Sequence, residues 1–279
     1  MISPLSRTLI RVLAVLYAVL GVILFVAPTW SAANFSWKIS PFVAMTMGGW
    51  SLGNAFTAWE TARIGRWSLV YANVVYLLVF GLLEATVLIL FRGKLILNVA
   101  MAWPYLLALT LNVIVVLLLT IEWLRTKPEI SAEGFEVPAW TRWLMGVFIL
   151  FVGFLAIYGW ISGAESHGTD ASVFPETLSL FTLRAFASFY AALASAVVPL
   201  IWTKGSSAVT TLGRAGMSFI IVITIAALVN LNKFTFAEHP GQLVYLGAYI
   251  GAFFVLSGLF LYDRRQRATT SETRNREIQ

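Results

Sequence analysis

The chain has 279 residues, of which 59% are hydrophobic and only 11% are charged. Soluble globular domains are about a quarter charged, so this composition excludes an ordinary soluble protein. The apolar residues fall in runs of about 20, which is the length that crosses a bilayer as a helix. The sequence therefore predicts an all-α, polytopic integral membrane protein whose first partner is the lipid bilayer.

Residue types that support catalysis or metal binding are scarce. Cysteine is absent and only two histidines occur, both outside the apolar runs. Disulfides, iron–sulfur clusters, thiolate zinc sites, cysteine nucleophiles and a membrane bis-histidine haem are therefore excluded. No phosphate-binding loop, Gly-x-Ser-x-Gly motif or metal-ligand pair on a helix occurs either. We accordingly predict no metal, no cofactor and no enzymatic activity.

Eight apolar runs are long enough to span a bilayer as helices. The first begins near Arg7 and Arg11 and is followed by Ser31-Ala32-Ala33, so that it resembles a cleavable secretory signal. We keep it as a span because a similar helix recurs in the middle of the chain. The predicted spans are, in chain order, 9–27, 41–59, 67–91, 99–124, 143–162, 178–202, 215–236 and 243–262.

The distribution of basic residues predicts the orientation. With the N-terminus inside, the cytoplasmic segments hold 14 of the 19 Lys and Arg residues and the outer loops hold three. Positive residues are retained on the cytoplasmic side, so both termini are predicted to be cytoplasmic, in a prokaryotic-type inner membrane. The same distribution explains the net charge of +6 without nucleic acid as a partner.

Weak internal similarity predicts a 4+4 parallel repeat, with both halves in the same orientation. The division is residues 1–126, a cytoplasmic linker at 127–138, residues 139–263, and a basic tail at 264–279 that we expect to be disordered. Three matches carry this prediction, the first two at an offset of 139 and the third at 148. They are Ser40-Pro41-Phe42 with Ser179-Leu180-Phe181; Gly49, Gly53 and Thr57 with Ser188, Ala192 and Ala196; and Ile64-Gly65-Arg66 with Leu212-Gly213-Arg214.

Three ionisable residues fall inside predicted spans, where a charge is costly unless it faces the bundle and finds a partner. Glu84 and Arg184 lie at similar depths below the outer boundary, which predicts an ion pair between them. Three pairs of residues are spaced so that they share a helix face, namely Asn73 and Glu84, Asn230 and Lys233, and Tyr105 and Asn112. The predicted ligand-binding residues are Glu84, Arg184, Asn230, Lys233, Asn73 and Asn112. A purely structural ion pair is the alternative interpretation of the first two.

Two functional hypotheses follow. In the first, an intramembrane polar site near the outer leaflet binds or transports a small polar or amphipathic molecule. In the second, the protein is a non-catalytic accessory or assembly subunit of a larger membrane complex. Small-residue faces at Gly49/Gly53 and Gly247/Gly251 predict close helix packing, either within the monomer or against a membrane-protein partner or a second copy.

Overall fold

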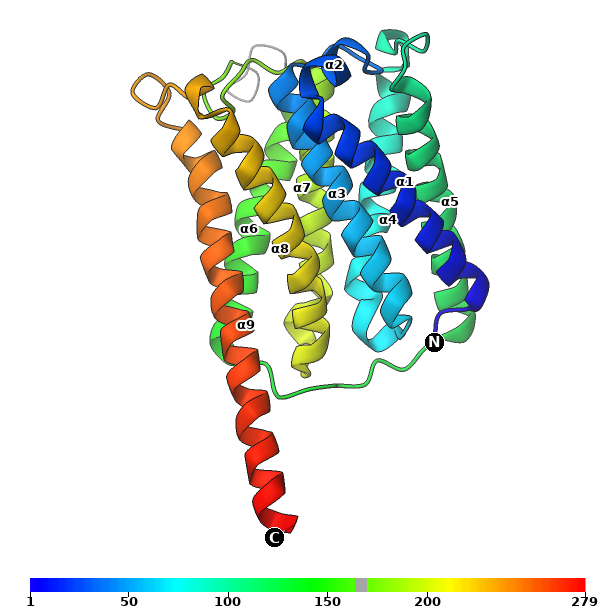
Figure 1. Ribbon diagram of the computed structural model, residues 1–279, viewed down its shortest axis with the longest axis vertical. Coiled ribbons are helices and arrows are strands. Elements are labelled where there is room, and N and C mark those ends of the chain that lie inside the picture. The colour runs from blue at the N-terminus through cyan, green and yellow to red at the C-terminus, as the bar shows by residue number, and fades with distance from the viewer. Residues whose placement is uncertain (164–169, 279) are drawn as a thin grey trace.

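A computed structural model describes residues 1–163 and 170–278, with residues 267–278 as backbone only. Within these ranges the chain is helical and forms no β-strand (Figure 1). The short elements are α2 (Pro28–Ala33), η1 (Arg92–Lys94), η2 (Val198–Trp202) and η3 (Leu231–Lys233). The long helices are α1 (Pro4–Val26), α3 (Pro41–Ile64), α4 (Trp67–Leu90), α5 (Ala102–Thr126), α6 (Ala139–Ile161), α7 (Leu180–Val197), α8 (Ser206–Val229) and α9 (Gln242–Ile278).

The long helices stand side by side as a bundle with two distinct ends (Figure 1). Both termini and residues 127–138 lie at one end, which we call the base. The opposite end, which we call the top, carries α2, η1 and η3. The segment 127–138 is tied to the start of α8, because Val137 donates its N–H to the Lys204 carbonyl and Ser206 donates to the Phe135 carbonyl.

Seven helices of the described chain are long and apolar enough to cross a membrane. They are α1, α4, α5, α6, α7 continued by η2, α8, and α9 as far as Gln266. The chain is therefore an integral membrane protein of the multi-pass helical class. The remaining long helix, α3, carries Ser, Thr, Asn and Gly side chains, and most of its 24 residues are buried.

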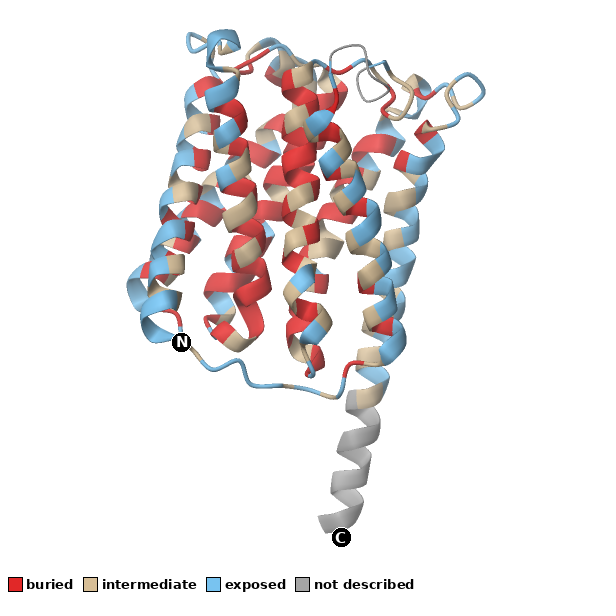
Figure 2. Ribbon diagram, turned by 180° about the vertical axis from the view of Figure 1, so that it is seen from behind, coloured by how far each residue is buried: buried red, intermediate tan, exposed pale blue. Residues whose placement is uncertain are grey.

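Packing divides the bundle into an inner and an outer layer. Helices α3, α4, α7 and α8 form the inner layer, in which α3 packs against α8 and α4 packs against α7 and α8. On the outside, α1 covers α3, α5 covers α4, α6 covers α7 and α9 covers α8. Buried residues accordingly concentrate on the inner helices, and exposed residues on the outer ones (Figure 2).

Local sequence signals fix where the inner helices begin and end. Ser40 and Ser179 are N-caps, since their hydroxyls accept the N–H of Val43 and of Thr182, each at 3.2 Å. Gly65 ends α3 in the left-handed conformation with φ of 61°, a conformation that glycine adopts without steric cost.

The structure corrects two of the sequence predictions. Helix α8 runs from Ser206 to Val229, so the span predicted at 215–236 is wrong at both ends. Leu212-Gly213-Arg214 lies inside α8, whereas Ile64-Gly65-Arg66 is the turn after α3, so the match at offset 148 is also wrong. Helix α9 runs from Gln242 to Ile278.

Candidate functional site

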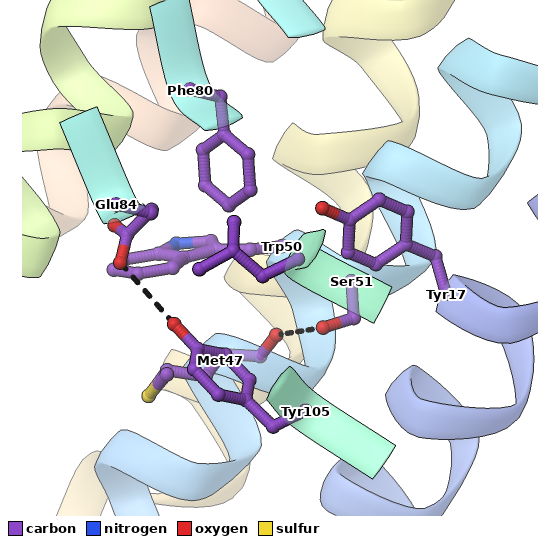
Figure 3. Close-up of a pocket in the computed structure, with 8 residues that line it drawn as sticks. Tyr17, Met47, Trp50, Ser51, Phe80, Glu84 and Tyr105 are labelled. Atoms are coloured by element: carbon purple, nitrogen blue, oxygen red, sulfur yellow. Dashed lines mark hydrogen bonds between the residues drawn. The ribbon is translucent and has the colours of Figure 1, made fainter. Parts of the chain in front are cut away.

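Glu84 lies on α4 in the interior of the first half of the chain, with 1% of its surface exposed. Its Oε2 accepts a hydrogen bond of 3.3 Å from the Tyr105 hydroxyl of α5 (Figure 3). Its Oε1 is buried and has no hydrogen-bond partner. A carboxyl group with a single hydrogen bond in an apolar interior is energetically costly. Packing alone would therefore favour an apolar residue in place of Glu84.

A small void adjoins Glu84. It has a volume of about 10 Å³, and α1, α3, α4 and α5 contribute its lining. That volume is about what one water molecule needs, so the void cannot hold an organic ligand. Its lining residues are Tyr17, Met47, Trp50, Ser51, Phe80, Glu84, Tyr105 and Leu109.

Arg184 does not pair with Glu84, so the predicted ion pair is wrong. Its guanidinium instead donates to the carbonyls of Gly159 and Ser162, both at 3.1 Å, and lies over the ring of Trp160. These carbonyls belong to the last turn of α6, where unpaired acceptors and the helix dipole favour a cation. Similar depth placed the two residues at one level, but Glu84 faces α5 and Arg184 faces α6.

Lys233 and Asn230 do not share a helix face, because α8 ends before both residues. Lys233 lies in η3 and forms an ion pair with Glu176, whose second oxygen accepts a hydrogen bond from Ser40. The Asn230 amide donates to the Ala226 carbonyl of the preceding turn and contacts the Met45 sulfur at 3.5 Å. These interactions hold loops and helix ends together at the top.

Asn73 and Asn112 are fully buried and connect neighbouring helices. The Asn73 amide donates to the Thr61 hydroxyl at 3.3 Å, and the Asn112 amide donates to the Leu77 carbonyl at 3.1 Å. The structure therefore distributes the six predicted site residues over separate places. Glu84 borders a small void, and the six form no common site.

Sequence reasoning missed Glu60, a buried carboxylate near the base. Its side chain is 5% exposed and forms ion pairs with Arg63 at 2.7 Å and with Arg214 of α8 at 2.9 Å. The i, i+3 spacing of Glu60 and Arg63 was a readable signal, but Arg214 could be placed only once α8 was known to begin before it.

Sequence reasoning also missed a large cavity in the second half of the chain, which we call the α6–α9 cavity. It has a volume of about 470 Å³ and lies between α6, α7, α8 and α9, with Val173 and Phe174 at its top. None of the described residues that line it is charged, and nearly all are apolar. Its walls include Phe148 and Leu155 of α6, Leu193 of α7, Leu212 of α8 and Val255 of α9.

The α6–α9 cavity extends over most of the bundle's height. Its lining on α6 runs from Thr141 to Gly159, which at the helical rise corresponds to about 27 Å, close to the thickness of a bilayer's hydrocarbon core of about 30 Å. The segment above it is held in place by Gln242, which donates to the carbonyls of Ala171 at 2.8 Å and Phe174 at 3.3 Å.

The two predicted small-residue faces have different roles. Gly49 and Gly53 pack against Ile223 and Phe219 of α8, where a Cβ on Gly53 would lie 2.0 Å from the Phe219 ring. This face is therefore a contact within the monomer. Gly247 and Gly251 of α9 have no neighbour within 4 Å of a Cβ placed on them, and both line the α6–α9 cavity.

Comparison with protein-family models, curated proteins and solved structures finds no match for this chain. The inference of function therefore rests on the α6–α9 cavity and on the buried polar groups.

Proposed function

We propose that this integral membrane protein binds an elongated, largely apolar or amphipathic molecule from the bilayer in the α6–α9 cavity. The single observation that carries the proposal is a cavity of about 470 Å³ whose described lining is free of charge. Ligand sites are concave, mostly apolar and about 300–1,000 Å³ in volume. We propose binding rather than catalysis, because no charged side chain among the described lining residues is available for acid–base chemistry.

The proposal includes eight membrane spans, with α3 as the eighth. Both termini lie at the base (Figure 1), which requires an even number of crossings. The polar side chains of α3 are covered by α1, α4 and α8, so a less apolar helix is acceptable at this position. Basic residues gather where the helices meet the base, namely Arg63, Arg66, Arg125 and Arg142. Positive residues are retained on the cytoplasmic side, so the proposed orientation places the base in the cytoplasm, in a prokaryotic-type inner membrane.

The proposal also includes a 4+4 parallel repeat, and two observations support it. The offset of 139 relates Pro41 to Leu180 at the starts of α3 and α7, Trp67 to Ser206 at the starts of α4 and α8, and η1 to η3. The contacts also match in pairs, since α1–α3 corresponds to α6–α7, α4–α5 to α8–α9, and α3–α8 to α7–α4. A two-fold axis along the membrane normal produces this pattern.

In this register the void beside Glu84 and the α6–α9 cavity are equivalent sites. Six of the void's residues have counterparts in the cavity lining, if α5 and α9 are aligned from Ala102 and Gln242 at their starts. The counterparts are Met47 and Phe186, Trp50 and Phe189, Ser51 and Tyr190, Phe80 and Phe219, Tyr105 and Tyr245, and Leu109 and Tyr249. The first site is closed because α1 packs against α5, whereas α6 and α9 make at most marginal contact.

Photolabelling in liposomes tests the proposed binding. The probe is a hexadecane that carries a diazirine, and adducts are located by mass spectrometry of peptides. We expect labelling of Leu193 and Leu212, which line the cavity on inner helices. Gly251→Leu fills the cavity and should reduce this labelling severalfold.

Gly258→Leu is the matched control, because Gly258 lies on α9 in equally open space but does not line the cavity. It should leave the labelling of Leu193 and Leu212 unchanged. Adducts confined to outward-facing residues such as Leu150 and Phe154 would contradict the proposed function, as would labelling of Leu193 that is insensitive to Gly251→Leu.

A further inference from the structure

We infer that the α6–α9 cavity holds a single hydrocarbon chain with a backbone of about 16–20 carbon atoms, which runs along the cavity and crosses the midplane of the bilayer. This inference rests on the proposed function. It adds the length of the bound chain, the number of chains and the route of entry.

The walls of the cavity on three helices agree on its length. The lining runs from Thr141 to Gly159 on α6, from Leu183 to Leu200 on α7 and η2, and from Val244 to Leu259 on α9. At the helical rise these ranges correspond to about 22–27 Å. Since each leaflet contributes about 15 Å of hydrocarbon, a cavity of this length passes from one leaflet into the other.

The volume of the cavity limits how many chains it holds. An extended hydrocarbon chain advances about 1.25 Å per carbon atom, so a chain of about 16–20 carbon atoms is about 20–25 Å long. At the packing density of protein interiors such a chain occupies about 430–540 Å³, which matches the cavity volume of about 470 Å³. Two such chains side by side would need about twice this space. One chain therefore fills the cavity along its length.

One long chain is also favoured over two short chains placed end to end. The contacts with the apolar walls are similar in the two cases, because the same lining is covered. Each bound molecule loses translational and rotational freedom, however, so two short chains incur this loss twice. The difference favours a molecule that reaches from one end of the cavity to the other.

A chain of this length can enter sideways, because the cavity opens between α6 and α9. The rings of Trp140 and Tyr262 meet near the base with centroids 5.8 Å apart, and the two helices otherwise make at most marginal contact. Val147 and Val255 lie seven residues above this contact on α6 and α9, and therefore at one height. Both line the cavity and both are exposed. Hydrocarbon can thus enter from the bilayer without crossing a polar interface.

A probe with two photoreactive ends tests the inference in the full-length protein in liposomes. It is an unbranched chain of about 20 carbon atoms with a diazirine at each end, and an analogue of half that length is the short control. We expect the long probe to bridge Leu183 and Leu200, which line opposite ends of the cavity. The short probe should form at least about tenfold fewer such bridges, because it is shorter than the distance between them.

Two variants show whether the bridging chain runs through the cavity. Gly251 lies at mid-height on α9, so Gly251→Leu should abolish the bridges while single adducts at Leu183 and Leu200 persist. Gly258→Leu is the matched control and should retain the bridges, because Gly258 does not line the cavity.

Unbranched acyl chains and isoprenoid chains both have the inferred shape. Hexadecane and phytane share one backbone length and differ only in methyl branches. The compound that suppresses the bridges at the lower mole fraction identifies the source of the chain.

Single adducts of the long probe without bridges, or bridges that are insensitive to Gly251→Leu, would overturn the inference. Labelling of Leu193 and Leu212 by the photoreactive hexadecane would in that case leave the proposed function intact. Absence of the hexadecane probe from both residues would overturn the proposed function itself.

Discussion

Trp50 of α3 and Phe189 of α7 stack in the interior of the bundle, with ring centroids 4.7 Å apart and planes 9° apart. They are 139 residues apart in the chain, the same separation as between the starts of α3 and α7. A two-fold axis between the halves would bring a residue against its own counterpart in this way. Apart from this stacking, α3 and α7 make at most marginal backbone contact, while α3 packs on α8 and α4 packs on α7.

A double-mutant cycle will distinguish the partners of Glu84. Glu84→Leu leaves the Tyr105 hydroxyl unpaired, and Tyr105→Phe leaves the carboxyl without its hydrogen bond. The combined variant removes both groups, so its loss of melting temperature in detergent should be clearly smaller than the sum of the two. Glu84→Leu and Arg184→Met should add within about 0.5 kcal/mol. Strong coupling of Glu84 with Arg184 would mean that the interior is arranged differently.

The two arginines that surround Glu60 should be mutually redundant. Arg63→Met or Arg214→Met alone leaves the carboxylate with one cation, and a partly exposed pair contributes about 1 kcal/mol or less. The double variant leaves a buried, unpaired carboxylate, which costs about 3–5 kcal/mol. Melting temperatures in one detergent measure the difference, with the exposed Arg11→Met as the control. Additive small losses would show that Glu60 is well solvated.

Cysteine accessibility tests whether α3 crosses the membrane, and the chain contains no cysteine of its own. Lys38 precedes α3 at the top and is exposed, whereas Arg63 is exposed at the base. Lys38→Cys should react with an impermeant maleimide on intact cells, and Arg63→Cys only after permeabilisation. Reaction of both from the same side would exclude α3 as a span.

The crossing of α1 and α3 depends on glycine. A Cβ on Gly48 would lie 2.7 Å from the backbone nitrogen of Phe25 and 3.0 Å from the Gly21 carbonyl oxygen. Gly48→Ala should therefore destabilise the protein by about 1–3 kcal/mol through overpacking. Gly153→Ala on α6 meets no neighbouring atom and should be neutral or slightly stabilising, because alanine favours helix. Equal melting temperatures for the two variants would contradict the close approach.

The sequence predicted the helices well where a polar cap or a turn bounds an apolar run. Ser40 and Ser179 both cap helices, and the ends of α4 and α6 differ from the predictions by a few residues at most. The prediction failed at α8, where the apolar run passes through Asn230 and Asn232 into the loop. A run of apolar residues shows what prefers lipid, but it does not show where backbone hydrogen bonding stops.

The site was harder to predict, because depth along a helix follows from residue count while direction around it depends on the neighbours. Glu84 is buried as predicted, but Arg184 faces α6 instead of Glu84. The α6–α9 cavity had no signal, since Phe148 facing a cavity and Leu150 facing outward are equally apolar. Gly247 and Gly251 predicted helix contact, and in the structure they make space instead.

An experimental structure of the protein in lipid nanodiscs tests the central claim most directly. We predict that α6 and α9 stay apart and that elongated density fills the cavity between them, in contact with Leu193 and Leu212. An arrangement in which α6 packs against α9 as α1 packs against α5, with no space between them, would contradict the account.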